Sequence, residues 1–153
     1  MSKVKNIDGT PHFPVVSLFS GAMGLDIGLM QAGLNIAVSQ DYDKWCVETI
    51  KKNGHVGVLG DIRELINQDP SCDFLLKAGG LKKDSVFAVV GGPPCQSFST
   101  AGKRLGVEDE RGQLYNQFIH VVDQLRPRFF VMENVKGLAS TLVDPADKQS
   151  LPL

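Results

Sequence analysis

One cysteine in a proline-rich turn is the residue best suited to covalent chemistry. Cys95 follows an apolar run and lies in the segment Gly91-Gly-Pro-Pro-Cys-Gln96. Two consecutive prolines fix backbone angles and remove two hydrogen-bond donors, so they hold Cys95 outside a core element. The thiolate form of cysteine is a nucleophile, and its surroundings set its pKa. We therefore interpret Cys95 as a candidate nucleophile, and Cys46 and Cys72 as structural residues.

A second candidate, Glu133, closes the apolar run of residues 128–132. A carboxyl group in such a setting usually has a partner or a raised pKa. It could then donate a proton or a hydrogen bond to a heterocyclic ring. The alternative is a carboxylate that only orders the neighbouring turn.

Glycines and acidic residues after three further apolar runs suit an adenosine-containing ligand. Gly21 and Gly24 follow the first run, where glycine lets the backbone approach an anionic ligand closely. Asp41 ends the second run, a position from which a carboxylate can accept hydrogen bonds from ribose hydroxyls. Asp61 ends the third and could accept from an adenine amino group, cap the following helix, or both.

These residues must be positioned by strands and helices that alternate along the chain. Strands are expected over residues 13–19, 35–39, 56–59, 85–90 and 128–132, and helices over residues 25–33, 43–53, 62–67 and 114–125. Residues 68–85 look like a polar surface connection. The polar stretch 96–112 is too long for an ordinary connection and is typical of a functional or mobile loop.

This alternation predicts an α/β fold with a doubly wound, mostly parallel sheet. Ligands of such sheets bind outside the carboxyl ends of the strands. The candidates obey that rule, since each follows a different strand: Gly21, Asp41, Asp61, Cys95 and Glu133.

Length and composition favour one catalytic domain over residues 13–138, with polar tails at 1–12 and 139–153. The chain has 153 residues, 42% of them hydrophobic and 22% charged, which is ordinary for a globular domain. Its 16 basic and 17 acidic residues give a formal charge of -1, too low for a protein that binds duplex DNA by charge alone.

The cysteines and histidines exclude two further classes. Three cysteines without framework spacing argue against a disulfide-bonded secreted domain and favour a reducing compartment, and His12, His55 and His120 share no metal-ligand spacing. The apolar runs are too short to span a membrane. We expect a cytoplasmic protein without a metal site.

Taken together, six segments resemble the N-terminal catalytic part of the cytosine-5 DNA methyltransferase family. They occur in the family's order, over about residues 14–138: Phe19-Ser-Gly-Ala-Met-Gly24, Asp41-Tyr42, Gly60-Asp61-Ile62, Gly92-Pro-Pro-Cys-Gln-Ser-Phe-Ser99, Arg111-Gly-Gln-Leu114 and Glu133-Asn-Val135.

The resemblance implies a Rossmann-like, S-adenosylmethionine-dependent enzyme that methylates C5 of a cytosine flipped out of double-stranded DNA. Cys95 would attack C6 of the base and Glu133 would hold N3, while the Pro93 carbonyl would read the exocyclic amine. The cofactor would be bound by Phe19, Gly21, Gly24, Asp41, Tyr42, Asp61, Ile62, Pro93 and Leu114. The DNA would be contacted by Pro93, Gln96, Ser99, Lys103, Arg104 and Arg111. Such an enzyme of a restriction-modification system would associate with the nucleoid.

The chain also departs from the family. Met23 stands where a glycine is common, and no Gln-x-Arg-x-Arg segment or target-recognition region follows before Leu153. We therefore expect a fold truncated after about five strands that transfers little methyl alone. It would be part of a longer enzyme or be complemented by a second, C-terminal chain.

Three other functions remain open. The chain could be an inactive remnant that binds cofactor weakly or serves as an interaction module. It could also belong to the related enzymes that methylate tRNA cytosines. A dehydrogenase is the most distant alternative, because Met23 and the Pro-Pro-Cys turn both argue against it.

Overall fold

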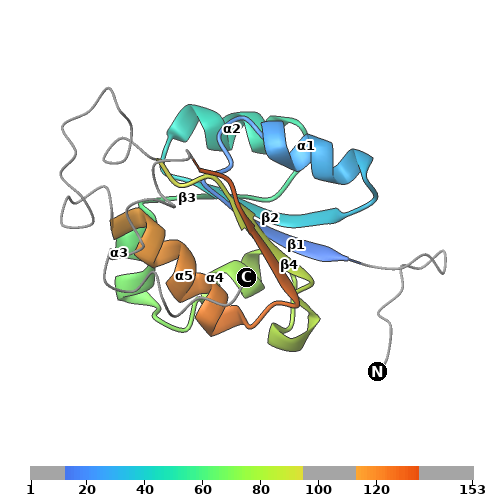
Figure 1. The fold of residues 1–153 in the computed structure, drawn as a ribbon. Helices are drawn as coiled ribbons and strands as arrows, with labels where there is room; N and C mark the ends of the chain where they lie inside the picture. Colours follow the sequence, from blue (N-terminus) through green and yellow to red (C-terminus); the bar gives the residue numbers. More distant parts are fainter. Residues whose placement is uncertain (1–12, 95–112, 135–153) are drawn as a thin grey trace, which may run out of the picture.

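The computed structural model describes residues 13–94 and 113–134. These residues form a five-stranded parallel sheet with helices on both faces (Figure 1). The elements are β1 (Pro14–Leu18), α1 (Gly24–Gln31), β2 (Asn35–Asp41), α2 (Lys44–Lys52), β3 (Gly57–Leu59), α3 (Ile62–Gln68), α4 (Asp73–Ala78), the 3-10 turn η1 (Lys83–Ser85), β4 (Ala88–Gly91), α5 (Gln113–Leu125) and β5 (Phe129–Met132).

The strand order is β3-β2-β1-β4-β5, and every neighbouring pair is parallel. The predicted doubly wound sheet is thereby confirmed. The chain runs outward from β1 through β2 to β3, then crosses to β4 on the other side of β1. The carboxyl ends of all five strands meet at one edge, and β1 and β4 form the switch point at which such folds bind ligands.

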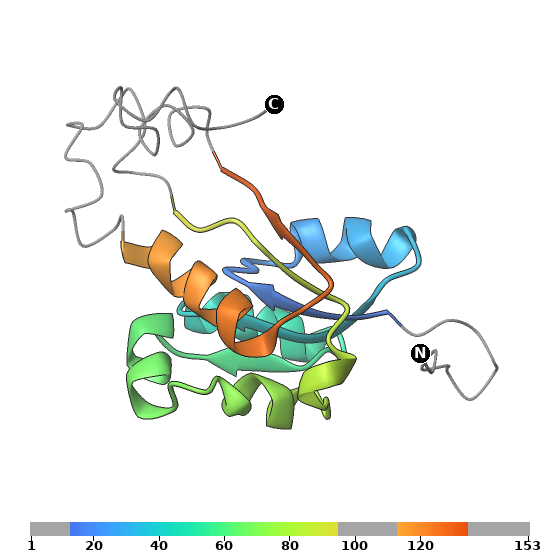
Figure 2. The ribbon, with the colours of Figure 1, turned by 60° about the horizontal axis from the view of Figure 1, so that its bottom comes forward.

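Alternating side chains of the strands build a core on each face of the sheet. Val16, Leu18, Val38 and Val89 pack with residues of α3, α4 and α5. Val15, Ile36, Ala88 and Val90 pack on the other face against Leu29 and Met30 of α1. Figures 1 and 2 show the resulting layers, with α1 and α2 on one side of the sheet and α3, α4 and α5 on the other.

The expected surface connection at residues 68–85 is wrong, because it contains α4 and part of the core. Leu75 and Leu76 of α4 are buried against the sheet, as is the preceding Cys72. The apolar segment is short and is flanked by polar residues and two glycines, so its contribution to the core is hidden in the composition.

Strand bounds also differ from the expected ones, for β1 and β2 at the ends that carry the site. β2 extends through Asp41, because its last residues pair with β3 up to Asp41 and Leu59. β1 stops at Leu18, since Phe19 adopts a left-handed conformation with φ 54°. β4 begins only at Ala88, after the 3-10 turn.

Close contact between β1 and β4 depends on a glycine. A methyl group added to Gly91 would lie 2.5 Å from the carbonyl oxygen of Leu18. Only glycine therefore lets the last residues of these two strands approach each other without displacement.

Candidate active site

The turn after β1 is held in an unusual backbone conformation. Phe19, Gly21 and Met23 all have positive φ values of 54°, 53° and 69°. The left-handed region costs a residue with a side chain roughly 1–2 kcal/mol. Met23 is nevertheless buried, at 2% exposure, so its side chain anchors the turn in the core and offsets this cost.

Asp41 fastens this turn to the end of β2. The backbone N–H of Gly21 donates to Oδ2 of Asp41 at 2.8 Å, and that of Asp43 donates to Oδ1 at 2.9 Å. Asp41 itself is buried. Both carboxylate oxygens thus order the protein's own backbone, a role that the sequence did not indicate. The ribose contact stays a prediction, which the remaining lone pairs allow.

A buried carboxylate beneath the turn was missed by the sequence analysis. Asp26 of α1 is completely buried and accepts hydrogen bonds from the hydroxyls of Ser17, at 2.5 Å, and Ser39, at 2.7 Å. Ser20 in turn donates to Ser17 at 2.9 Å. The available signal was the pair of serines inside otherwise apolar strands, together with an acidic residue on the buried face of α1.

A cavity of about 240 Å³ lies at the carboxyl edge of the sheet, next to the start of α5. Five of the predicted cofactor residues line it: Phe19, Tyr42, Asp61, Ile62 and Leu114. Its other lining residues are Gln40, Arg63 and Pro94, which the sequence analysis did not assign to the cofactor. The walls are therefore aromatic and aliphatic, with polar groups from the ends of β2 and β3. We call this the nucleoside cavity, after the ligand that the sequence analysis predicts for these residues.

Asp61 is the N-cap of α3. The sequence analysis gave this role as one of two interpretations of the residue. Its Oδ1 accepts from the backbone N–H of Arg63 at 2.9 Å. The Arg63 guanidinium also donates to Oδ2 at 2.6 Å, and this hydrogen bond is the main reason why the pKa of Asp61 lies below its usual value. Arg63 thus supplies a positive charge at the polar wall of the nucleoside cavity.

A second cavity, of about 250 Å³, lies at the switch point between β1 and β4. It is lined by Ser17, Leu18, Phe19, Ser20, Leu25, Asp26, Gly92 and Glu133. Phe19 lines both cavities. We call the second one the switch-point cavity.

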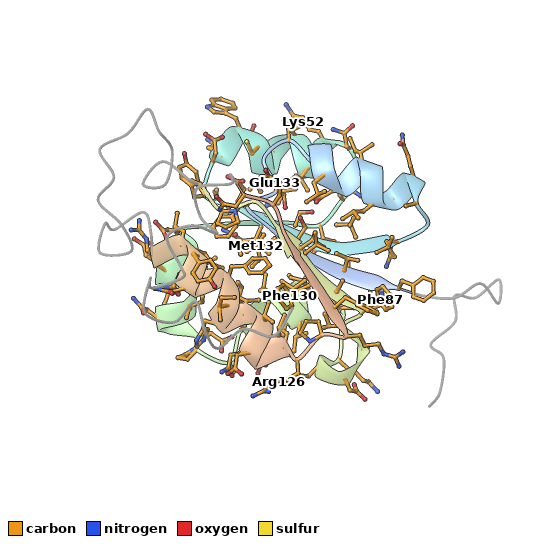
Figure 3. All side chains as sticks on the ribbon, in the orientation of Figure 1. Lys52, Phe87, Arg126, Phe130, Met132 and Glu133 are labelled. Carbon is orange, nitrogen blue, oxygen red and sulfur yellow. The ribbon has the colours of Figure 1, made fainter. Side chains whose placement is uncertain are left out.

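Glu133 lies exposed immediately beyond β5, where Figure 3 labels it next to Met132. Its backbone N–H donates to the Gly91 carbonyl at 2.9 Å, which continues the ladder between β4 and β5. A methyl group on Gly92 would lie 3.1 Å from Oε2 of Glu133. Gly92 and the Glu133 carboxylate thus lie side by side, and both residues line the switch-point cavity.

Asn134 connects the ends of β4 and β5. Its Nδ2 donates to the carbonyl of Pro93 at 3.2 Å, an interaction that the sequence analysis did not foresee.

Pro93 is buried, and it is Pro94 rather than Pro93 that lines the nucleoside cavity. Three further residues predicted to bind the cofactor also line neither of the two cavities: Gly21, Asp41 and Gly24, the residue at which α1 begins.

The described cysteines fit structural roles. Burial raises the pKa of the Cys72 thiol to about 11, and burial is also the main cause that raises the pKa of Cys46. Both therefore stay protonated near neutral pH, in keeping with the structural interpretation. The remaining predicted catalytic and DNA-contacting residues lie outside the described residues: Cys95, Gln96, Ser99, Lys103, Arg104 and Arg111.

Two kinds of feature are absent from the described residues. Residues 13–94 and 113–134 contain no group of three or more His, Cys, Asp or Glu side chains that could hold a metal ion. Within the same ranges no helix has the length and apolar character needed to cross a membrane.

Comparison with known families gives a match over most of the chain. A family model described as C-5 cytosine-specific DNA methylase matches residues 13–145. This range includes every residue that was predicted to bind cofactor, substrate or DNA.

Curated relatives are named type II methyltransferases. M.AquIA of Picosynechococcus sp. is 44% identical over 126 residues, which cover 81% of this chain and 49% of that protein. M.FnuDI of Fusobacterium nucleatum is 42% identical over 127 residues, or 82% of this chain and 33% of the relative. The chain thus spans between about a third and a half of the length of these relatives.

Solved structures agree on the fold. A prophage-encoded DNA modification methyltransferase from E. coli aligns with a TM-score of 0.62 and 28% identity, covering 90% of this chain and 35% of that one. The S. pombe Dnmt2 methyltransferase aligns with a TM-score of 0.60 over 86% of this chain and 37% of its own. Its identity of 22% shows likeness of fold alone.

Proposed function

The chain belongs to the C-5 cytosine-specific DNA methylase family, and from this premise we propose that it takes part in methyl transfer from S-adenosylmethionine to C5 of cytosine in DNA. The observation that carries the proposal is the nucleoside cavity. Residues from five separate segments of the chain, at the ends of β1, β2, β3 and β4 and at the start of α5, converge there.

The nucleoside cavity fits the adenosine part of this cofactor. Phe19, Ile62 and Leu114 offer apolar surfaces to a flat base, and the exposed Tyr42 ring lies at the rim. Gly21 and Asp41 are proposed to face the ribose, since they lie together at the ends of β1 and β2. When bound, S-adenosylmethionine supplies an activated methyl group.

We assign the reaction with cytosine to the ends of β4 and β5. The Cys95 thiolate adds to C6 of the base, which makes C5 nucleophilic. Glu133 holds N3 through a hydrogen bond and stabilises the charge that develops on the ring. After C5 is methylated, a water molecule accepts the C5 proton, and the electron pair of that C–H bond re-forms the C5–C6 double bond and expels the Cys95 thiolate. The base has to leave the stack for this attack, and the loop residues Gln96, Ser99, Lys103, Arg104 and Arg111 are proposed to contact the DNA around it.

We further propose that additional polypeptide packs on β5, either from a longer form of this protein or from a second chain. Phe129, Phe130 and Val131 are 59%, 55% and 50% exposed, although strands of a parallel sheet normally have both faces covered. Figure 3 labels Phe130 in the middle of this strand. Because β5 is an edge strand in the described sheet, its backbone is also open to pairing. Sequencing the gene beyond codon 153 and beside it tests this part of the proposal.

Cofactor binding is tested by calorimetric titration of the 153-residue chain with S-adenosylhomocysteine. We expect Phe19→Ala to weaken binding at least tenfold, because it removes the aromatic ring of a residue that lines both cavities. The matched control is Phe13→Ala, since Phe13 contacts Phe87 at the opposite end of β1. An unaltered affinity in Phe19→Ala would contradict the assignment of the cavity.

Methyl transfer is tested in a bacterial host without cytosine methylation of its own. The gene is expressed together with the DNA that follows codon 153 and lies beside the gene. The 5-methylcytosine content of the host DNA is then measured by mass spectrometry. We expect Cys95→Ser to abolish the product, whereas Cys46→Ser keeps it. Persistent methylation in Cys95→Ser would exclude this nucleophile, and robust methylation by residues 1–153 alone would exclude the need for further polypeptide.

A further inference from the structure

Two neighbouring glycines at the end of β4 have different surroundings. A methyl group added to Gly91 would meet the carbonyl oxygen of Leu18, which belongs to the backbone of β1. The three atoms nearest to a methyl group on Gly92 would all belong to Glu133, and the shortest distance, 3.1 Å, is to the carboxylate atom Oε2. The space beside Gly91 is therefore taken by a strand, and the space beside Gly92 by a side chain.

The backbone itself does not require glycine at position 92. Gly92 is not among the described glycines that have a positive φ, so an alanine would not be strained there. Replacing glycine by alanine at such a position usually stabilises a protein, because the unfolded chain loses conformational freedom. What glycine provides at this position is space.

Glu133 lies opposite Gly92 on the neighbouring strand end. Gly91 pairs with Met132, and the backbone N–H of Glu133 donates to the Gly91 carbonyl, so residues 92 and 133 continue the same register. Besides Oε2, the Cβ of Glu133 would lie 3.9 Å from the added methyl group. The side chain thus folds back, so that its first carbon and its carboxylate both border Gly92.

The two carboxylates of the switch-point cavity are held in different ways. Asp26 accepts hydrogen bonds from Ser17 and Ser39. Within residues 13–94 and 113–134, the Glu133 carboxylate has neither a hydrogen bond nor an ion pair. Its place beside Gly92 is therefore a matter of available space rather than of a polar partner.

We propose that Gly92 is a positioning residue for methyl transfer, because its lack of a side chain lets the Glu133 carboxylate lie beside it and meet the base from there. This inference rests on the proposed function, since it concerns how Glu133 is presented to N3 of cytosine. Ordinary van der Waals contact begins near 3.4 Å, so an alanine would displace the carboxylate by a few tenths of an ångström. Because Glu133 is exposed, its side chain yields while the strands stay in place.

The contact is tested first on the 153-residue chain, without any reaction. We expect the NMR resonance of the Glu133 carboxyl carbon to shift in Gly92→Ala, and the urea denaturation midpoint to equal or exceed that of the wild type. Gly28→Ala is the matched control, since nothing lies within 4 Å of its added methyl group, and it should leave the resonance in place. An unmoved resonance in Gly92→Ala, or a clearly lower midpoint, would overturn the inference.

The reaction is tested in the enzyme formed with the polypeptide encoded beyond or beside codon 153. A displacement of about 1 Å can slow a reaction on the order of a hundredfold, so we expect kcat of Gly92→Ala to fall about tenfold. The KM for S-adenosylmethionine should stay near the wild-type value, because Gly92 does not line the nucleoside cavity. Gly28→Ala should keep the wild-type kcat.

A double variant tests whether Gly92 acts through the carboxylate. In Glu133→Asp the side chain is one methylene shorter, which withdraws the carboxylate from the space beside Gly92. We expect Gly92→Ala to cause little further loss of kcat in this background, so that the two effects are not additive. A further loss as large as in the wild-type background would mean that the methyl group obstructs the base itself, and would overturn the positioning role.

Two remaining outcomes separate this inference from the proposed function. If the wild-type enzyme makes no 5-methylcytosine, the proposed function fails and the role of Gly92 fails with it, whatever the resonance of Glu133 does. If the wild-type enzyme is active and Gly92→Ala has an unaltered kcat, only the role of Gly92 is overturned.

Discussion

The strand ends on the two sides of β1 meet at the same edge of the sheet but are built differently. On the β2–β3 side, Asp41 and Asp61 are tied to backbone N–H groups, and Asp41 is buried. On the β4–β5 side, Glu133 is exposed and β5 carries three exposed apolar side chains. Backbone N–H groups thus hold the carboxylates of the first side in place, whereas the carboxylate of Glu133 on the second side is exposed. Under the proposed function, binding and reaction fall on these two different parts of one edge.

The largest effect is expected where the two sides join. Gly91→Ala places a methyl group 2.5 Å from the Leu18 carbonyl oxygen and should force β1 and β4 apart. We expect the free energy of unfolding to fall by about 3 kcal/mol or more, measured by urea denaturation. Gly28→Ala is the control, since nothing lies within 4 Å of its added methyl group and helix propensity favours alanine there. Equal stability of the two variants would contradict the close approach.

The next effect concerns Asp26, the buried carboxylate that accepts a hydrogen bond from Ser39 of β2. Asp26→Ala leaves the hydroxyls of Ser17 and Ser39 without their acceptor. We expect it to lower the free energy of unfolding by about 2–3 kcal/mol in urea denaturation. The exposed Asp84 provides a control, because Asp84→Ala should change stability little. A small effect at Asp26 would show that the network does not support the turn.

Asp41→Ala should affect both folding and binding. It removes the acceptor of two backbone N–H groups, so we expect a loss of about 2 kcal/mol in unfolding free energy. The affinity for S-adenosylhomocysteine, measured by calorimetry, should also fall at least tenfold because the turn with Gly21 is released. Unchanged affinity would remove Asp41 from the site and leave it a purely structural residue.

A smaller effect on the β4–β5 side would sharpen the comparison. Asn134→Ala removes one hydrogen bond, to the Pro93 carbonyl, and should cost about 1 kcal/mol or less in urea denaturation. Affinity for S-adenosylhomocysteine should not change, since Asn134 lines neither cavity. A large loss of affinity would mean that the two sides are coupled.

The smallest effect is a pH dependence at Asp61. Arg63 lowers the pKa of this carboxyl below its ordinary value of 3.8, so its contribution is present above that pH and is lost as the pH falls below it. Because the pair is partly exposed and solvent screens it, we expect less than about 1 kcal/mol. Urea denaturation at pH 5 and pH 3 should show a smaller loss in Asp61→Asn than in the wild type. An identical loss would exclude this contribution.

The sequence predicted the sheet and much of the cavity, because strand–helix alternation and polar residues at strand ends are local signals. Phe19, Tyr42, Asp61, Ile62 and Leu114, which the sequence analysis grouped together, line one cavity. Their assignment to a cofactor remains a proposal. α4 was missed because its few apolar residues lie in a polar segment.

What the sequence could not reveal depends on three-dimensional proximity. The contacts between Asp26 and Ser39 and between Asn134 and Pro93 join residues far apart in the chain. Met23 is similar, since only the structure shows that a left-handed residue is compensated by burial of its side chain.

The strand order also has a consequence for the order of folding events. Val15 pairs with Ile36 on one side and with Ala88 on the other, so closing the second pairing requires a loop more than three times longer. That difference costs about 1 kcal/mol of chain entropy. A nascent chain is thus expected to assemble β1, β2 and β3 while β4 is still unpaired. The β2–β3 side would then be the template onto which the β4–β5 side is added.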